Sequence, residues 1–304
     1  VATLLSGMLP VLESFFGITT EISWIELADL NNPLLKRLTM EAPGTYHHSL
    51  LVGALAENAA ERVGANATMA RVCSYFHDIG KLESPQYFIE NQGDGINPHD
   101  ELTPHMSAKM ILAHVTDGVT LAEKHRLNPR IVEVIREHHG TSLVYVFYRN
   151  AMTKREEQLE EVGNGLRAEE DVVTVEEEDF RYLGPTPRSK ESAIISLADA
   201  CESARRSLQG NDIEEIRELV DRLVGERIKD GQLDSADLTL EELSEIKKSF
   251  VSDLKSMAHA RPSYRAEKTP FAEEETNSAK GAEPEAKSEE KPESVETVAA
   301  NDRD

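Results

Sequence analysis

Apolar residues recur at intervals of three and four along most of the chain, and this spacing is typical of one face of an α-helix. After Pro43-Gly44-Thr45, positions 50, 51, 54, 55 and 59 are all Leu or Ala. Thr45 is a suitable N-cap for this helix, because its hydroxyl can accept a hydrogen bond from a free main-chain N–H. His48 is then expected in the first turn, facing the apolar interior.

The same periodicity predicts six further helices, at residues 67–77, 107–114, 129–138, 192–207, 213–228 and 240–257. Pro129 suits the first turn of its helix. Leu143–Tyr148 is the only run rich in aromatic and β-branched residues, and it either forms a strand or continues the helix that ends near 138. The pattern therefore predicts an all-α fold without internal repeats.

The two ends of the chain differ from the region between them. Residues 1–17 are apolar except for Glu13 but are too few to span a bilayer alone, so we interpret residues 1–20 as the end of a transmembrane helix or a membrane-proximal segment. The alternative is an amphipathic helix that caps the domain. Residues 266–304 are rich in Glu, Lys, Ala, Pro and Ser, which predicts an acidic disordered tail. Residues 21–265 form the predicted catalytic domain.

Composition restricts the class of partner. The 304 residues are 39% hydrophobic, which is enough for a core, and carry a formal net charge of −23, much of it at 156–179 and 267–296. Such a surface repels nucleic-acid polymers, so a small nucleotide is the better substrate.

Cys73 and Cys201 are too few for a disulfide framework, which indicates a reducing compartment.

Histidine and aspartate residues at helix ends and inner faces predict a metal site. His77-Asp78 is the centre of this set, and neutral imidazoles with a bridging carboxylate suit two adjacent divalent cations. We expect ordinary surface or core roles for His47, His99, His105, His125 and His259. The candidate ligands are His48, His77, Asp78, His114, His138, His139 and Asp199.

These residues and their surroundings resemble a known family. The order H…HD…D is that of the HD-domain phosphohydrolases, and the added histidines resemble the dinuclear branch of that superfamily. The chain is most similar to the cytoplasmic domain of the seven-transmembrane HD phosphodiesterases of the PgpH type, from about residue 10 to 265. The motifs that carry the resemblance are Glu41–Ser49, Tyr75–Lys81, Phe88–Gln92, Asn97–Asp100, Glu137–Thr141, Phe180–Pro185 and Leu197–Asp199.

The resemblance implies a helical bundle around a dinuclear site that hydrolyses cyclic di-AMP to linear pApA. It implies a first metal on His48, His77, Asp78 and Asp199, and a second on Asp78, His114, His138 and His139. Iron or manganese are the implied metals. It also implies attachment to the cell membrane through a preceding transmembrane region, with the catalytic domain on the cytoplasmic side. The oligomeric state is not implied.

Two further roles concern the substrate. Lys81, near Asp78, is expected to reach the phosphate and stabilise charge in the transition state, so that Asp78 and Lys81 are the catalytic candidates. The competing interpretation of Lys81 is a solvent-facing residue at a helix end. The polar loop 90–100 supplies the candidate substrate contacts Asn91, Gln92 and His99.

Other functions fit the same ligand set less well. A cyclic di-GMP phosphodiesterase of the HD-GYP type shares the metals, but no Gly-Tyr-Pro sequence occurs in this chain. A nucleoside-triphosphate or alarmone hydrolase is a more distant alternative. A regulatory module that binds a cyclic dinucleotide without hydrolysing it is a third, against which the complete ligand set argues.

Overall fold

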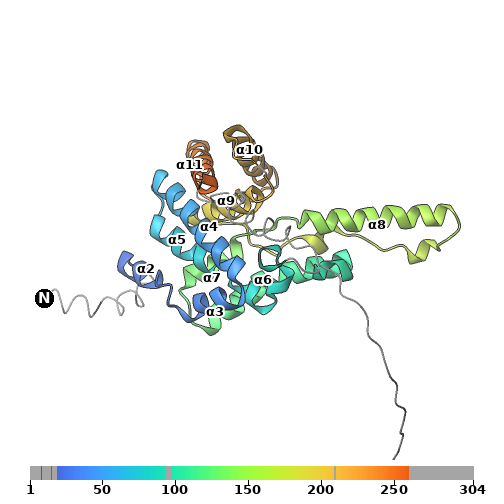
Figure 1. The fold of residues 1–304 in the computed structure, drawn as a ribbon, viewed down its shortest axis with the longest axis horizontal. Coiled ribbons are helices and arrows are strands. Elements are labelled where there is room, and N and C mark those ends of the chain that lie inside the picture. Colours follow the sequence, from blue (N-terminus) through green and yellow to red (C-terminus); the bar gives the residue numbers. More distant parts are fainter. Residues whose placement is uncertain (1–7, 9–14, 16–18, 94–96, 209, 260–304) are drawn as a thin grey trace, which may run out of the picture. The chain divides into compact units, whose positions relative to one another are not determined.

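The computed structural model describes residues 8, 15, 19–93, 97–208 and 210–259. Within these ranges the chain forms helices and no β-strand, apart from one isolated antiparallel bridge between Leu143 and Arg181 (Figure 1). The α-helices are α2 (Glu21–Leu27), α3 (Pro33–Glu41), α4 (Pro43–Arg62), α5 (Ala67–Phe76), α6 (Pro104–Lys124), α7 (Pro129–Glu137), α8 (Tyr145–Gly163), α9 (Lys190–Arg205), α10 (Ile213–Lys229) and α11 (Leu240–His259). Short 3₁₀ helices lie between them: η1 (Ile79–Glu83), η2 (Pro85–Tyr87), η3 (Ile89–Asn91), η4 (Pro98–Glu101), η5 (Glu169–Asp171) and η6 (Glu177–Phe180).

Three helices begin with the same local signal. The side chains of Asn32, Thr103 and Asn128 each accept a hydrogen bond from a main-chain N–H in the first turn of α3, α6 and α7. A proline follows each of these N-caps, where its fixed φ suits the helix and its missing N–H costs no hydrogen bond. Sequence alone therefore determines where these helices start.

The core lies around α4, which packs against α5, α9 and α11, while α5 also packs against α7 and α9. The removal of aliphatic and aromatic side chains from water at these contacts is the main force that holds the helices together. The largest fully buried side chains include Leu34, Leu35, Leu38, Leu55, Phe76, Ile131, Ile135, Ile194, Ile195 and Phe250. The predicted all-α class is confirmed.

A close approach between α6 and η1 depends on glycine. A Cβ at Gly80 would lie 1.8 Å from the carbonyl oxygen of His114, and one at Gly118 would lie 2.9 Å from Ile135 Cγ2 and 3.3 Å from Gly80 N. Only residues without a side chain allow the backbone of η1 to lie directly on α6. This contact brings the segment that follows His77-Asp78 next to His114.

Two predicted helix boundaries are wrong. α4 begins at Pro43 with Ala42 as its N-cap residue, so Thr45 lies inside the first turn and does not cap the helix. Its N–H donates instead to Asn91 Oδ1 (3.1 Å), a partner distant in sequence. His48 accordingly lies in the second turn. α6 extends well beyond the predicted 107–114, because burial of Gly118 and Leu121 outweighs the low helix propensity of the β-branched residues around them.

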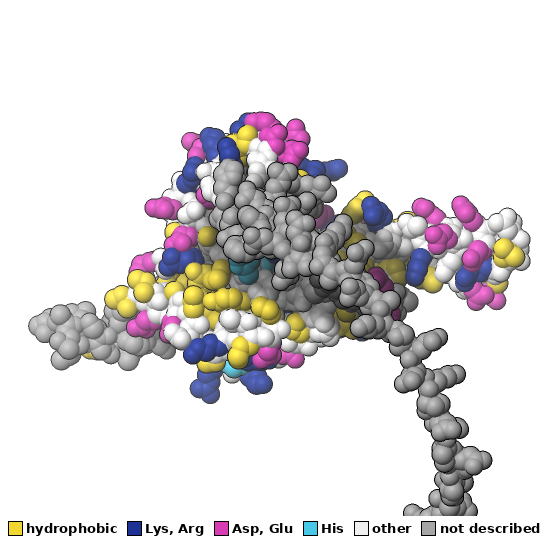
Figure 2. Space-filling view, viewed as in Figure 1, with side chains coloured by type: hydrophobic (Ala, Val, Ile, Leu, Met, Phe, Trp, Pro, Cys, Tyr) yellow, Lys and Arg dark blue, Asp and Glu magenta, His cyan; other side chains and the backbone are white. Residues whose placement is uncertain are grey.

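The run Leu143–Tyr148 neither forms a strand nor continues the preceding helix. α7 ends at Glu137, and α8 starts separately at Tyr145. Of α8 only Ala151 is buried, and the helix runs away from the others (Figure 1). Acidic side chains are spread along it in the space-filling view (Figure 2). The periodicity did not predict α2 and α3, because both helices are short. It also did not predict α8, because this helix has few apolar positions.

The predictions for the two ends fall mostly outside the described residues. This holds for the membrane segment at 1–20, of which only Met8, Phe15, Thr19 and Thr20 are described, and for the whole tail at 266–304. The described residues all belong to one compact unit, Val1–Ala260. Among them, no helix has the length and apolar content that a bilayer crossing requires.

Candidate metal centre

Five helices and the turns that follow them bring all seven predicted ligands together. His48 comes from α4, His114 from α6 and Asp199 from α9, whereas the other four stand where helices end. His77 is the C-cap of α5 with Asp78 next to it, and His138 is the C-cap of α7 with His139 next to it. All are buried except His139, whose side chain is 17% exposed. The predicted convergence of the seven residues is thus observed.

Asp78 lies at the middle of the cluster and faces two sets of imidazoles. Its Oδ2 is 3.5 Å from Nε2 of His48 and 3.3 Å from Nε2 of His77. Its Oδ1 is 3.4 Å from Nε2 of His114 and 3.7 Å from Nε2 of His138. Each carboxylate oxygen therefore has its own pair of nitrogen neighbours, which is the arrangement that a bridging ligand needs.

Asp199 contacts both sides of the cluster. Its Oδ1 lies 3.1 Å from His48 Nε2 and 4.0 Å from His77 Nε2, and its Oδ2 lies 3.6 Å from His139 Nδ1. Two groups have all their ligand atoms within 4.8 Å of one another: one is His48, His77 and Asp78, and the other is Asp78, His114, His138 and His139. His47, His105 and His125, which we expected to be ordinary residues, belong to neither group.

The backbone selects the ring nitrogen that points into the centre. Nδ1 of His77, His114 and His138 lies 2.7, 2.6 and 2.7 Å from the carbonyl oxygen three residues earlier in each case. Since a carbonyl can only accept, Nδ1 of these rings carries the proton, and Nε2 of a neutral ring keeps its lone pair. The same arrangement is found where histidine binds a metal.

Two buried polar atoms of the cluster, Nε2 of His77 and Oδ1 of Asp78, have no hydrogen-bond partner, and Oδ2 of Asp78 has the ammonium group of Lys81 beside it. Unpaired polar atoms away from water are costly, so they indicate a missing partner. Imidazole nitrogen and carboxylate oxygen together suit divalent transition metals. The residues present therefore fit a metal site.

The pKa shifts of Asp78 and His114 favour metal-binding protonation states, whereas the shift of His48 does not. Burial would raise the pKa of Asp78, but His77 and Lys81 hold it well below its ordinary value. Burial lowers the pKa of His114 to about 4, so this ring is neutral. Burial also acts to lower the pKa of His48, but its hydrogen bonds to Asp199 and Glu202 raise it to about 9. A metal ion at His48 would thus compete with a proton.

Lys81 points inward and is mostly covered, so the interpretation of a solvent-facing lysine is wrong. Its side chain is 12% exposed, and Nζ lies 2.8 Å from Asp78 Oδ2 and 2.7 Å from Glu90 Oε1. Burial acts to lower the pKa of Lys81, but the nearby Asp78, Glu90 and Asp199 raise it above its ordinary value. A fixed positive charge therefore stands beside the cluster.

The three candidate substrate contacts, Asn91, Gln92 and His99, make hydrogen bonds within the protein that hold the loop over the start of α4. Asn91 uses both ends of its amide, since Oδ1 accepts from Thr45 N (3.1 Å) and Nδ2 donates to Thr45 Oγ1 (2.8 Å). Gln92 Nε2 donates to the carbonyl of Gln86 at 3.0 Å. His99 Nε2 lies 2.8 Å from the carbonyl oxygen of Tyr87. Their contact with a substrate stays a prediction.

Sequence reasoning missed the residues around the ligands. Glu202 Oε2 lies 2.5 Å from His48 Nδ1, and Glu90 holds Lys81. The ring of Tyr182 stacks on His139 with centroids 4.3 Å apart. Only Glu202 had a local signal, because it follows Asp199 by three residues and so lies on the same face of α9.

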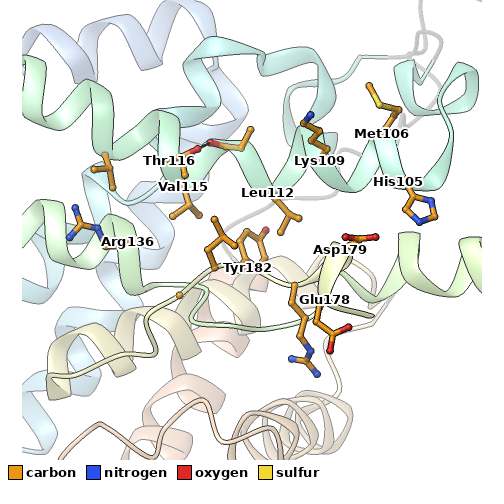
Figure 3. Close-up of a pocket in the computed structure, with 15 residues that line it drawn as sticks. His105, Met106, Lys109, Leu112, Val115, Thr116, Arg136, Glu178, Asp179 and Tyr182 are labelled. Atoms are coloured by element: carbon orange, nitrogen blue, oxygen red, sulfur yellow. Dashed lines mark hydrogen bonds between the residues drawn. The ribbon is translucent and has the colours of Figure 1, made fainter. Parts of the chain in front are cut away.

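Tyr182 also borders a cavity of about 770 Å³ that runs along α6. Figure 3 shows Tyr182 near Leu112 and Val115 of α6, with Glu178 and Asp179 on the opposite wall. Most of the surface that lines this cavity is apolar. Tyr182 lines this cavity and also stacks on His139 of the histidine cluster.

Comparison with known proteins identifies relatives of this arrangement. The family model of the HD domain matches residues 45–204. The chain is 41% identical over 263 residues to "Cyclic-di-AMP phosphodiesterase PgpH" of Bacillus subtilis (strain 168), which covers 86% of this chain and 35% of that protein. It is 39% identical over 262 residues to the protein of the same name from Listeria monocytogenes serotype 1/2a (strain 10403S), over 86% of this chain and 34% of the relative.

A solved structure agrees with these matches. The PgpH HD domain of L. monocytogenes in complex with cyclic di-AMP superimposes with a TM-score of 0.67 and 40% identity, covering 76% of this chain and 100% of the solved chain. The chain spans about a third of the length of the curated relatives named above.

Proposed function

The chain belongs to the HD domain family, and from that premise we propose that it is a metal-dependent phosphodiesterase that hydrolyses cyclic di-AMP to linear pApA. The observation that carries this proposal is Asp78, whose two oxygens face separate sets of imidazoles 3.3–3.7 Å away. The PgpH proteins that resemble the chain support the choice of cyclic di-AMP.

The proposed centre holds two divalent ions, iron or manganese. His48, His77, Asp78 and Asp199 would hold the first, and Asp78, His114, His138 and His139 the second. These are the two groups whose ligand atoms converge, except that Asp199 is added to the first. It is added because its Oδ1 lies closer to His48 Nε2 than the Oδ2 of Asp78 does. The donor set has no thiolate and suits either metal.

When bound, such ions polarise a phosphodiester and lower the pKa of water, which supplies a nucleophile at neutral pH. The chain supplies the rest. Asp78 is the proposed bridge. Lys81 is held by Glu90 beside the cluster, so its ammonium group is placed to contact a non-bridging phosphate oxygen and to stabilise the negative charge that grows on it.

The proposal extends to location. Attachment to the cell membrane through a region that precedes this domain, with the domain on the cytoplasmic side, is supported by the resemblance to the PgpH type. Fractionation of cells that express the natural protein tests it. A product found wholly in the soluble fraction would contradict membrane attachment and leave the enzymatic proposal intact.

The decisive experiment compares three substrates. Protein loaded with Mn²⁺ or Fe²⁺ is incubated separately with cyclic di-AMP, cyclic di-GMP and pApA, and the products are separated by chromatography. We expect pApA from cyclic di-AMP and little turnover of the other two. Equal cleavage of cyclic di-GMP would refute the substrate, and binding of cyclic di-AMP without cleavage would favour a regulatory module.

A further inference from the structure

Three buried imidazoles of the cluster are oriented by the backbone beside them, but His48 is oriented by a distant side chain. Nδ1 of His77, His114 and His138 faces a carbonyl oxygen of its own helix. Nδ1 of His48 lies 2.5 Å from Glu202 Oε2, a carboxylate that α9 supplies 154 residues later in the chain. Glu202 is 6% exposed, so water does not screen this contact.

Arg206, one turn after Glu202 on the same stretch of chain, approaches the same nitrogen. Its Nη2 lies 2.8 Å from His48 Nδ1 and 2.5 Å from Glu202 Oε2, and its Nε lies 3.3 Å from Glu202 Oε1. A guanidinium group only donates hydrogen bonds, whereas a carboxylate only accepts them. Arg206 and Glu202 therefore favour opposite tautomers of a neutral His48.

The two tautomers differ in what they present to the centre. If Nδ1 accepts from Arg206, the ring proton is on Nε2 and that nitrogen has no lone pair. If Nδ1 donates to Glu202, the lone pair of Nε2 is free, and Nε2 is the atom that lies 3.1 Å from Asp199 Oδ1 and 3.5 Å from Asp78 Oδ2. Only the second tautomer binds a metal ion.

We propose that Glu202 is a positioning residue of the metal centre: it accepts the Nδ1 proton of His48, prevents Arg206 from donating to that nitrogen, and leaves Nε2 free to bind a divalent cation. This inference rests on the proposed function, because it needs a metal at His48. Arg206 has two opposed effects. It holds Glu202 in place in the natural protein, and it blocks the metal-binding tautomer when the carboxylate is lost.

Four proteins test this role: the natural chain, Glu202→Gln, Arg206→Ala and the double variant. Mn²⁺ alone is the probe, and its affinity and stoichiometry are measured by competition with a fluorescent chelator and by elemental analysis. Loss of an outer-shell partner of a metal-binding histidine weakens metal binding by about 10- to 100-fold. Glu202→Gln should therefore weaken one of the two ions by about that factor and leave the other bound. The double variant should bind the weakened ion more tightly than Glu202→Gln.

If Arg206→Ala acted only by damaging the fold, its effect would add to that of Glu202→Gln, and the double variant would bind Mn²⁺ more weakly still. Tighter binding by the double variant therefore indicates a positioning role of Glu202. Glu214→Gln, an exposed change on α10, is the matched control and should bind Mn²⁺ as the natural chain does. Circular dichroism of the metal-free proteins checks that each variant is folded. Unchanged affinity in Glu202→Gln, or a double variant that binds no better than Glu202→Gln, would overturn the positioning role alone. Failure of the natural chain to bind both Mn²⁺ and Fe²⁺ would overturn the proposed function, and this inference with it.

Discussion

The ammonium group of Lys81 lies 2.8 Å from the carboxylate of Asp78, the residue at the middle of the histidine cluster. Glu90 holds the same ammonium group from the other side at 2.7 Å. When Asp78 binds metal ions, Glu90 remains as a partner that keeps the lysine charged and in place. In the proposed function, Lys81 would therefore compete with the metals for Asp78 and supply a fixed cation beside the substrate.

We expect Lys81→Ala to lower kcat for every cyclic dinucleotide that the protein cleaves by about one to three orders of magnitude, because a charge that acts mainly in the transition state is lost. Metal content should not fall, since the substitution removes a cation that competes for Asp78. Steady-state kinetics and elemental analysis measure the two effects. Lys124→Ala, which removes an exposed lysine in the last turn of α6, is the control. An unchanged kcat would remove Lys81 from the catalytic machinery.

The bridging position of Asp78 predicts an unequal response to ligand substitutions. Asp78→Ala should empty or disorder both metal positions, because its two oxygens face both sets of imidazoles. His114→Ala should mainly weaken one of the two ions, since its Nε2 faces only Oδ1. Metal analysis of purified proteins gives the stoichiometry. Full metal content in Asp78→Ala would contradict the bridge.

The contact between Gly80 and α6 predicts a large loss of stability on substitution. A Cβ at Gly80 would lie 1.8 Å from the main-chain oxygen of His114, so Gly80→Ala forces η1 and α6 apart. We expect a loss of about 1–3 kcal/mol in the free energy of unfolding, the usual range for overpacking, together with weaker metal binding. Urea denaturation of the metal-free protein measures it.

Gly225→Ala is the matched control for this prediction. Gly225 lies inside α10, and apart from its chain neighbours and the adjacent backbone of that helix, no atom lies within 4 Å of the position that its Cβ would take. Alanine has the higher helix propensity, so this change should stabilise the protein by up to about 1 kcal/mol. Equal destabilisation by both substitutions would show that the close approach at Gly80 is not the cause.

The convergence of the seven candidate residues was predictable from sequence because each of them has a local signal. His77-Asp78 and His138-His139 stand at helix ends, and His48, His114 and Asp199 lie on predicted inner faces. Of the residues that contact them, only Glu202 has a local signal, which is its spacing of three residues from Asp199. Glu90, Glu202 and Tyr182 acquire their roles through contacts between segments far apart in the chain, which helical periodicity does not report.

The errors in the predicted fold have a similar origin. The N–H of Thr45 is satisfied by Asn91, 46 residues later, so the capping rule for short-range partners does not apply to it. α6 is longer than its propensity predicts because tertiary burial stabilises its second half. In both cases packing between distant segments outweighed the local preference.

The last prediction concerns the choice between adenine and guanine. In Gln92, Nε2 donates to Gln86 O and Asn97 Oδ1, and among the described residues none donates to its Oε1. A carbonyl oxygen accepts from the N6 amino group of adenine but repels O6 of guanine. We therefore expect Gln92→Ala to lower kcat/KM for cyclic di-AMP more than for cyclic di-GMP, with metal content unchanged. Asn91→Ala is the comparison, because both ends of its amide are bound to Thr45; it should instead lower stability and affect both substrates alike. Competition assays with the two cyclic dinucleotides measure the ratio directly, and a Gln92→Ala variant with the natural ratio would exclude this residue from base recognition.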